Sequence, residues 1–327
     1  VHLSPGLTNA LTGVASAAGD GTPMVVITGN TPSYHHAREP HQGMRLHADA
    51  SQGDIYRPIC KRVWRIDDAK FLADVMPRAL NLAQTGRSGA VLLDVPMDVF
   101  SHHIDAPAQE MSSRRPAYGR PGGSPDGIAD AVQLLQSAKA PAIFAGNGAM
   151  LSEASTELKA LAELLAMPVA TTLMGKGVFA EDHPLACGMT GIWGTRIANE
   201  TMHAADVIVA IGTAFGEADC SSWRPEHTFA IPPTRLIQID IDPQEVGKIY
   251  PVDVGLVGDA RATLKALTRE LGGMTLPDGK GRIAETARAR SAWEAGLKES
   301  QADNGKPIHP ARLLSEIAKL APEDAIY

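Results

Sequence analysis

Short, almost continuously apolar runs alternate with helical segments along the whole chain. PMVVITG at 23–29 and AVLLDV at 90–95 are rich in apolar and β-branched residues, and between them an apolar residue recurs every three or four positions over 72–82. The runs are typical of buried strands, and the recurrence is typical of a helix with one apolar face. Strands that are apolar on both faces belong to parallel sheets covered by helices on both sides. The sequence therefore predicts an α/β fold.

The alternation continues beyond residue 124, so two sheets are predicted. The strands expected in the first sheet are 23–29, 63–66 and 90–95, and those in the second include 142–145, 168–173, 207–211, 236–241 and 254–257. Helices are expected over 8–18 and 72–82, from Pro125 after an N-cap at Ser124, and over 283–300 and 310–320. The Ser-Pro pair is a common helix start because proline lacks the N–H that would be unpaired there.

A proline-rich stretch without periodicity separates the two sheets. It divides the chain into an α/β domain at 1–105, a linker at 106–123, a Rossmann-like domain with a six-stranded parallel sheet at 124–272, and a second linker with the start of a third α/β domain at 273–327. The chain begins without an initiator Met and ends on the strand-like run Ala325-Ile326-Tyr327. We therefore expect an internal piece of a longer polypeptide.

Composition excludes several classes of function. The chain has 30 basic and 37 acidic residues and a net charge of −7, so it lacks the positive charge that nucleic-acid binding requires. No apolar run approaches the ~18 residues that a membrane-spanning helix needs. Three cysteines without a CxxC pair fit a reducing compartment and argue against disulfides or a cysteine-rich zinc site. We expect a cytoplasmic protein.

Two polar motifs follow apolar strands, at the edge where open α/β sheets bind ligands. Gly146-Asn147-Gly148 precedes a predicted helix, whose N–H groups could hold a pyrophosphate. Position 151 is Leu, so the third glycine of GxGxxG is missing and a plain tight turn is the favoured interpretation. Asp240 is predicted to accept a hydrogen bond from a ribose hydroxyl, whereas Asp242 is expected to cap a following helix.

Two further motifs are interpreted as loop structure. Four histidines and an aspartate lie between residues 35 and 49, but their spacing matches no standard set of metal ligands. We expect this loop to border a cofactor instead. Gly19-Asp20-Gly21 is interpreted as a turn because a strand follows it at once.

Several blocks together resemble one enzyme family. The blocks are SPGLTN (4–9), TPMVVITGN (22–30), RPICK (57–61), GAVLLDVPMDV (89–99), TTLMGKGVF (171–179), HPLACGMTGIWGT (183–195), ADVIVAIGTAF (205–215), LIQIDIDPQEVGK (236–248) and the tail at 309–327. Their order and spacing resemble thiamine diphosphate (ThDP) dependent enzymes, most closely the acetolactate synthase (acetohydroxyacid synthase) large subunit.

The resemblance implies an internal fragment of three domains. Residues 1–105 would be the C-terminal part of the pyrimidine-binding domain, 124–272 the central domain, and 273–327 the start of the diphosphate-binding domain. Enzymes of this family decarboxylate a 2-keto acid and pass the retained unit to an acceptor, and ThDP serves as the electron sink. Their catalytic glutamate would precede Val1, and their Mg²⁺ ligands would follow Tyr327. The family also implies a homodimer or homotetramer.

The resemblance assigns site residues in both domains. Pro5, Gly6 and Asn9 match the block beside the pyrimidine ring, although a helix start capped by Thr8 or Asn9 is an alternative explanation. Gln42 lies near a glutamine that faces the reacting carbon in the family, and a solvated loop is the alternative. In the central domain the nucleotide cleft would be formed by Thr172, Leu173, Met174 and Asp240.

The central domain departs from the family pattern where acetolactate synthases bind FAD. Their segment resembling R-F-D-D-R is Ala214-Phe215-Gly216-Glu217-Ala218 here, and Trp193 replaces a histidine. Each lost arginine removes charge-assisted hydrogen bonds worth roughly 1.5–3 kcal/mol. FAD binding is therefore not expected, and the cleft holds another nucleotide or none.

Other functions stay open at the level of sequence. Sister ThDP enzymes of the sulfoacetaldehyde acetyltransferase, oxalyl-CoA decarboxylase and benzaldehyde-lyase types share this chemistry. A noncatalytic nucleotide-binding module that uses residues 120–272 is an alternative of another class.

The 327-residue chain alone should release no CO₂ from pyruvate, with or without ThDP and Mg²⁺. The reason is that the catalytic glutamate and the metal ligands implied by the resemblance lie outside it. A CO₂ assay on the purified chain checks this, and release above the no-protein blank would contradict it.

Overall fold

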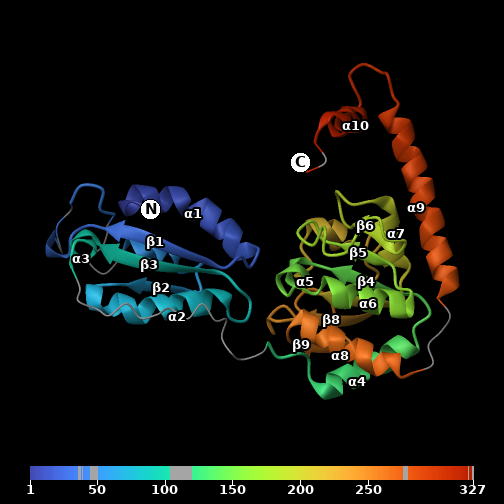
Figure 1. Ribbon diagram of the computed structural model, residues 1–327, viewed down its shortest axis with the longest axis horizontal. Coiled ribbons are helices and arrows are strands. Elements are labelled where there is room, and N and C mark those ends of the chain that lie inside the picture. The colour runs from blue at the N-terminus through green and yellow to red at the C-terminus, as the bar shows by residue number, and fades with distance from the viewer. Residues whose placement is uncertain are drawn as a thin grey trace. The chain divides into compact units, whose positions relative to one another are not determined.

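The computed structural model describes residues 1–35, 38, 40–44, 51–103, 120–274, 279–322 and 324–325. Two compact units, Val1–Gly119 and Arg120–Tyr327, divide the chain (Figure 1). Among the described residues, none of the helices combines the length and the apolar character that crossing a membrane requires.

The first unit is a small parallel sheet between helices. Its strands run in the order β1-β3-β2, all parallel. The main helices and strands are α1 (Leu3–Gly19), β1 (Met24–Asn30), β2 (Arg62–Arg65), α2 (Leu72–Gln84), β3 (Ala90–Pro96) and α3 (Met97–Phe100), with short 3₁₀ turns at Ser33–His35, Gln52–Tyr56 and Ala69–Phe71.

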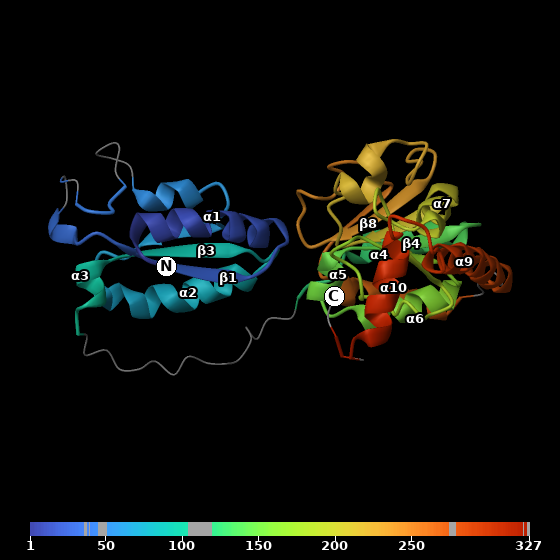
Figure 2. The same cartoon turned by 90° about the horizontal axis from the view of Figure 1, so that it is seen from above.

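The central strand β3 is buried along its whole length because helices cover both of its faces. Val91 and Leu93 pack in the cluster that contains α2, whereas Leu92 packs with Leu7 and Val14 of α1. Both views accordingly place α1 and α2 on opposite sides of the strands (Figures 1 and 2). This arrangement explains why the run AVLLDV shows no alternation of apolar and polar residues.

The second unit contains a six-stranded parallel sheet in the order β6-β5-β4-β7-β8-β9. Its strands are β4 (Pro141–Ala145), β5 (Val169–Thr171), β6 (Ala186–Met189), β7 (Val207–Ile211), β8 (Arg235–Asp240) and β9 (Val254–Val257). Its helices are α4 (Pro125–Gln136), α5 (Asn147–Leu151), α6 (Ser155–Leu165), α7 (Arg196–Ala204), α8 (Ala260–Gly272), α9 (Lys280–Gln301) and α10 (Pro310–Leu320), with a 3₁₀ segment at Ala218–Trp223. The expected α/β fold with two parallel sheets is confirmed.

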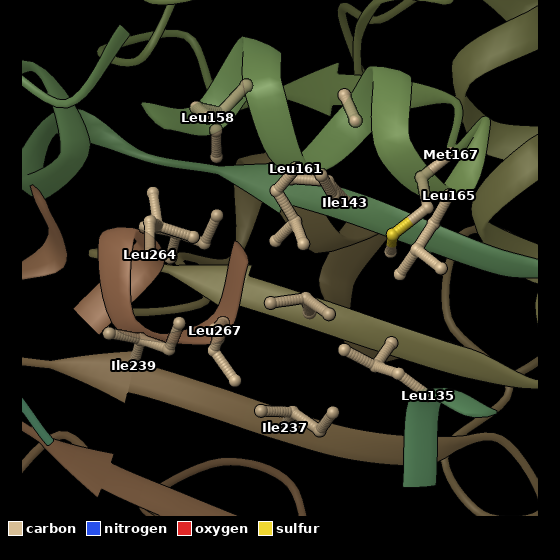
Figure 3. Packing of buried hydrophobic residues seen from close by; sticks show 14 of the residues in the cluster. Leu135, Ile143, Leu158, Leu161, Leu165, Met167, Ile237, Ile239, Leu264 and Leu267 are labelled. Atoms are coloured by element: carbon tan, nitrogen blue, oxygen red, sulfur yellow. The ribbon is translucent and has the colours of Figure 1, made fainter. Parts of the chain in front are cut away.

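Helices α4, α6 and α8 cover one face of the six-stranded sheet. Figure 3 shows the leucines of α6 and α8 directed toward the isoleucines of β4 and β8. The labelled residues include Leu158, Leu161, Leu264, Leu267, Ile143, Ile237 and Ile239, and each of them is 0% exposed. Helix α7 and the aromatic residues Phe215, Phe229 and Tyr250 cover the other face, where Phe215 and Phe229 pack against Phe144 of β4.

One strand was not located, and one helix prediction was wrong. Six strands were expected in this sheet, but the sequence located only five of them and missed β6, whose Gly188 has φ +87° next to a register shift opposite β5. No helix follows Asp242. Its carboxylate accepts from the Gln244 amide, but Gln238 then bonds to the backbone of Glu245 and Gly247 and holds the segment as turns.

The helix α9 is attached to the second unit through arginine side chains. Arg282 donates to the carbonyls of Leu165 and Ala166, which end α6 and lack partners within that helix. Arg290 donates to the carbonyl of His183. Both helices expected after residue 280 are present, but Ile326 and Tyr327 lie outside the described residues, so the expected third domain stays a prediction.

Truncating Leu161 to Ala should lower the free energy of unfolding by about 2–5 kcal/mol, because it leaves a cavity in the centre of the larger core. Denaturant unfolding monitored by circular dichroism measures the change. Leu320→Ala is the matched control, since Leu320 is 87% exposed, and it should shift stability by less than about 0.5 kcal/mol. Equal losses in the two variants would contradict this core assignment.

Candidate functional site

The first two turns of α1 carry the predicted pyrimidine-binding residues. The helix begins at Leu3 after His2, so the alternative in which Thr8 or Asn9 caps a helix start is wrong. Pro5 and Asn9 are exposed and Gly6 is half-buried. The opposite side of the turn is buried through Ser4 and Leu7 and fixes the helix against the sheet. The family block therefore lies on an accessible helix face with a rigid support.

Gln42 lies in a turn close to this helix. Its φ is +60° and its side chain is exposed. Two residues later, the Met44 amide donates to the Ser4 hydroxyl at 2.9 Å. The structure thus brings the segment of Gln42 to the first turn of α1, although no contact assigns the glutamine a role.

A buried carboxylate beside this turn was missed by the sequence analysis. Asp94 is 1% exposed at the end of β3. Its Oδ1 accepts from Gln52 Nε2 at 2.8 Å, and its Oδ2 accepts from Asn30 Nδ2 at 2.9 Å. Burial raises the pKa of Asp94, and the two amide donors oppose this shift. The sequence signal for this site was a single acid inside an apolar strand. A charge buried in such a strand requires hydrogen-bond partners.

A cavity of about 400 Å³ lies beside these residues at the carboxyl ends of β1 and β3. Its lining is mostly apolar, and Asn30 contributes an amide side chain to it. The lining residues are Val1, His2, Leu3, Ile27, Gly29, Asn30, Met97 and Phe100. A cavity at this edge of a parallel sheet is where ligands of α/β proteins bind.

The nucleotide-cleft residues of the second unit share one edge of its sheet. Thr172, Leu173 and Met174 follow β5, while Asp240 ends β8. Two strands separate β5 from β8, so the two groups are roughly 14 Å apart at ~4.8 Å per strand. They can border one extended ligand but cannot contact the same atom.

The polar groups at this edge largely form hydrogen bonds within the chain. The Thr172 hydroxyl accepts from the Gly175 amide, and Asp219 accepts from the Leu173 amide. One oxygen of Asp240 accepts from the Asp242 amide, and Asp240 is 8% exposed. Leu173 and Met174 are half-exposed and offer apolar surface instead.

The glycines of Gly146-Asn147-Gly148 allow this segment to lie in close backbone contact with Gly212. A Cβ on Gly146 would lie 2.3 Å from the carbonyl oxygen of Gly212, and one on Gly148 would lie 2.7 Å from the Gly212 Cα. Gly212 itself has φ +56°, which favours glycine. Contact between the loops after β4 and β7 therefore accounts for these glycines, and they give no sign of a pyrophosphate cradle.

In the segment that replaces the flavin-binding arginines, Phe215 alone is buried, while Ala214, Gly216 and Glu217 are exposed. Phe215 is buried against Phe144 and Tyr250, at ring-centroid distances of 5.6 and 5.1 Å. Trp193, which replaces the family's histidine, is 68% exposed. The segment 214–218 thus offers no cationic side chain to a flavin diphosphate.

No cluster of three metal-binding side chains occurs within the part of the chain that the structure describes. Of the histidine-rich segment, His35 and His41 are described, whereas His36, His47 and Asp49 lie outside the described residues. The cysteines Cys60, Cys187 and Cys220 are free. Burial raises the pKa of all three thiols, to about 11 for Cys60 and Cys187, so none is a thiolate nucleophile at neutral pH.

Comparison with known proteins matches both units to one family. The model described as "Thiamine pyrophosphate enzyme, N-terminal TPP binding domain" matches residues 1–51, and "Thiamine pyrophosphate enzyme, central domain" matches residues 128–267. The chain belongs to the thiamine pyrophosphate enzyme family. The first match contains α1 and β1, and the second contains the six-stranded sheet.

Sequence similarity to known relatives extends over nearly all of this ThDP-enzyme chain. A probable acetolactate synthase large subunit of Methanococcus aeolicus is 40% identical over 82% of the chain and 43% of its own length. A probable acetolactate synthase large subunit of Methanocaldococcus jannaschii is 35% identical over 98% of the chain and 52% of its own length. A glyoxylate carboligase of Escherichia coli O157:H7 is 31% identical over 99% and 53%. The chain spans about half the length of the relatives it matches.

Alkylation of Cys60 should require a higher pH in the folded chain than in the unfolded chain. Its thiolate should form only as the pH rises through about 11, so at pH 8 the folded chain should react on the order of a hundredfold more slowly than the chain in denaturant, where thiols titrate near 8.5. The rate of iodoacetamide reaction measured against pH tests this. A folded-state rate that follows the denatured profile would contradict it.

Proposed function

We propose that the whole protein is a ThDP-dependent carboligase of the acetolactate synthase type. It decarboxylates a 2-keto acid and transfers the retained two-carbon unit to an acceptor. The observation that carries this proposal is the match of the chain to two successive ThDP-enzyme domains, together with 35% identity over 98% of the chain to a probable acetolactate synthase large subunit.

The residues of the first unit fit one half of a ThDP site. An exposed face of α1 and an apolar cavity at the adjacent sheet edge suit a flat heterocycle. In this proposal Pro5, Gly6 and Asn9 contact the pyrimidine ring, and Gln42 faces the reacting carbon. ThDP, when bound, supplies the electron sink for the carbanion left by decarboxylation. The chain's own residues orient the ring and exclude water from it.

The remaining parts of the proposal concern the rest of the protein. The division assigns 1–105 to the pyrimidine-binding domain, 124–272 to the central domain and 273–327 to the start of the diphosphate-binding domain. Mg²⁺ is bound outside this chain, and flavin is not retained. The protein is a cytoplasmic homodimer or homotetramer, and its three free cysteines support a reducing compartment.

Removal and return of the cofactor test the proposed function. The full-length protein, freed of cofactor by EDTA and gel filtration, should lose CO₂ release from 2-keto acids and regain it with ThDP plus Mg²⁺. Pyruvate and glyoxylate are assayed in parallel, with product analysis for the acceptor. Activity that is independent of ThDP, or binding of ADP without any carboligase activity, would favour a nucleotide-binding module instead.

Asn9→Ala should raise the ThDP concentration for half-maximal activity by about 5- to 30-fold, the effect of losing one or two hydrogen bonds to the cofactor. Titration of the full-length enzyme with ThDP measures it. Asn81→Ala removes an exposed asparagine from α2 of the same unit and should leave the titration unchanged. An unaltered titration for Asn9→Ala would remove Asn9 from the site.

A further inference from the structure

A chain of buried hydrogen bonds leads from Asp94 to the segment that carries Gln42. Gln52 Nε2 donates to Asp94 Oδ1 at 2.8 Å, and the Ser4 hydroxyl donates to Gln52 Oε1 at 2.9 Å. The Met44 amide donates to the same hydroxyl at 2.9 Å. We call these four groups the Asp94 chain.

The charge of Asp94 sets the direction of every bond in the chain. An ionised carboxylate only accepts, so Gln52 must direct Nε2 toward it. The same Nε2 donates to the Gly29 carbonyl at 2.7 Å, which fixes the amide in this orientation. Gln52 Oε1 is then left to accept from Ser4, and a Ser4 lone pair is left to accept from Met44.

Water is largely excluded from three of the four groups, whereas Met44 is half-buried. Ser4, Gln52 and Asp94 are 4%, 3% and 1% exposed. A donor or acceptor deprived of its partner here would stay unpaired, which is more costly than at the surface. The Asp94 chain therefore joins four separate segments: β3, the 3₁₀ turn Gln52–Tyr56, the first turn of α1, and residues 40–44.

We propose that Asp94 is a positioning residue for the cofactor site. Through Gln52 and Ser4 it holds the segment of Gln42 against the turn of α1 that carries Pro5 and Gly6. This inference rests on the proposed function, because that function gives those residues their places beside ThDP.

Ser4→Ala tests the proposal without removing the buried charge. Amide hydrogen exchange over residues 40–44 should become about tenfold faster, since the Met44 amide loses its acceptor. In the full-length enzyme the ThDP concentration for half-maximal activity should rise several-fold. Ser88→Ala is the matched control, because it removes a hydroxyl that donates to the Gly21 carbonyl at the other end of the same sheet, and both measurements should match those of the unaltered protein.

Asp94→Asn tests the direction of the chain. Gln52 Nε2 and Asn30 Nδ2 both donate to the carboxylate, so the new N–H₂ group would meet a donor on whichever side it lies. Exchange over 40–44 should therefore rise as in Ser4→Ala. If this variant unfolds, as circular dichroism would reveal, Ser4→Ala decides the question.

The outcomes separate this inference from the proposed function. Unchanged exchange in Ser4→Ala overturns the holding of the Gln42 segment, and faster exchange with an unchanged ThDP titration overturns its role at the cofactor. An unaltered full-length protein without any ThDP dependence overturns the proposed function, whereas the exchange data still decide whether the Asp94 chain holds the loop.

Discussion

Burial of parallel strands on both faces is the constraint from which the rest of the structure follows. With helices on either side, β3 and β7 have no solvent-facing positions, so all their side chains except that of Asp94 are apolar. Polar groups are therefore concentrated where the strands end. In both units the candidate ligand-binding residues lie at or beside these ends, while the helices behind them form the cores that hold them in place.

The strands and most helices could be predicted because apolar runs and helical spacing are local signals. The errors arose where local signals were weak or contradicted. Strand β6 contains a glycine at φ +87°, and the segment after Asp242 is held in turns by Gln238 of β8, the strand that precedes it. The start of α1 was placed too late because His2 is an uncommon N-cap.

The candidate site was less predictable than the fold because its support is made by distant residues. Ser4 and Gln52 are 48 positions apart in the sequence, and Gln52 and Asp94 are 42 apart. No periodicity links them, although the acid in AVLLDV signals that partners exist. The residues assigned by resemblance form an accessible helix face in the first unit and an extended edge in the second, and this division matches the two ThDP-enzyme domains found by comparison.

The close contact between glycines in the second unit also has a mechanical consequence. The loops after β4 and β7 touch through main-chain atoms at Gly146, Gly148 and Gly212, with no side chain between them to yield. The Gly148 amide also donates to the Gly212 carbonyl at 3.0 Å. A side chain added at any of these glycines would therefore force the two strand ends apart.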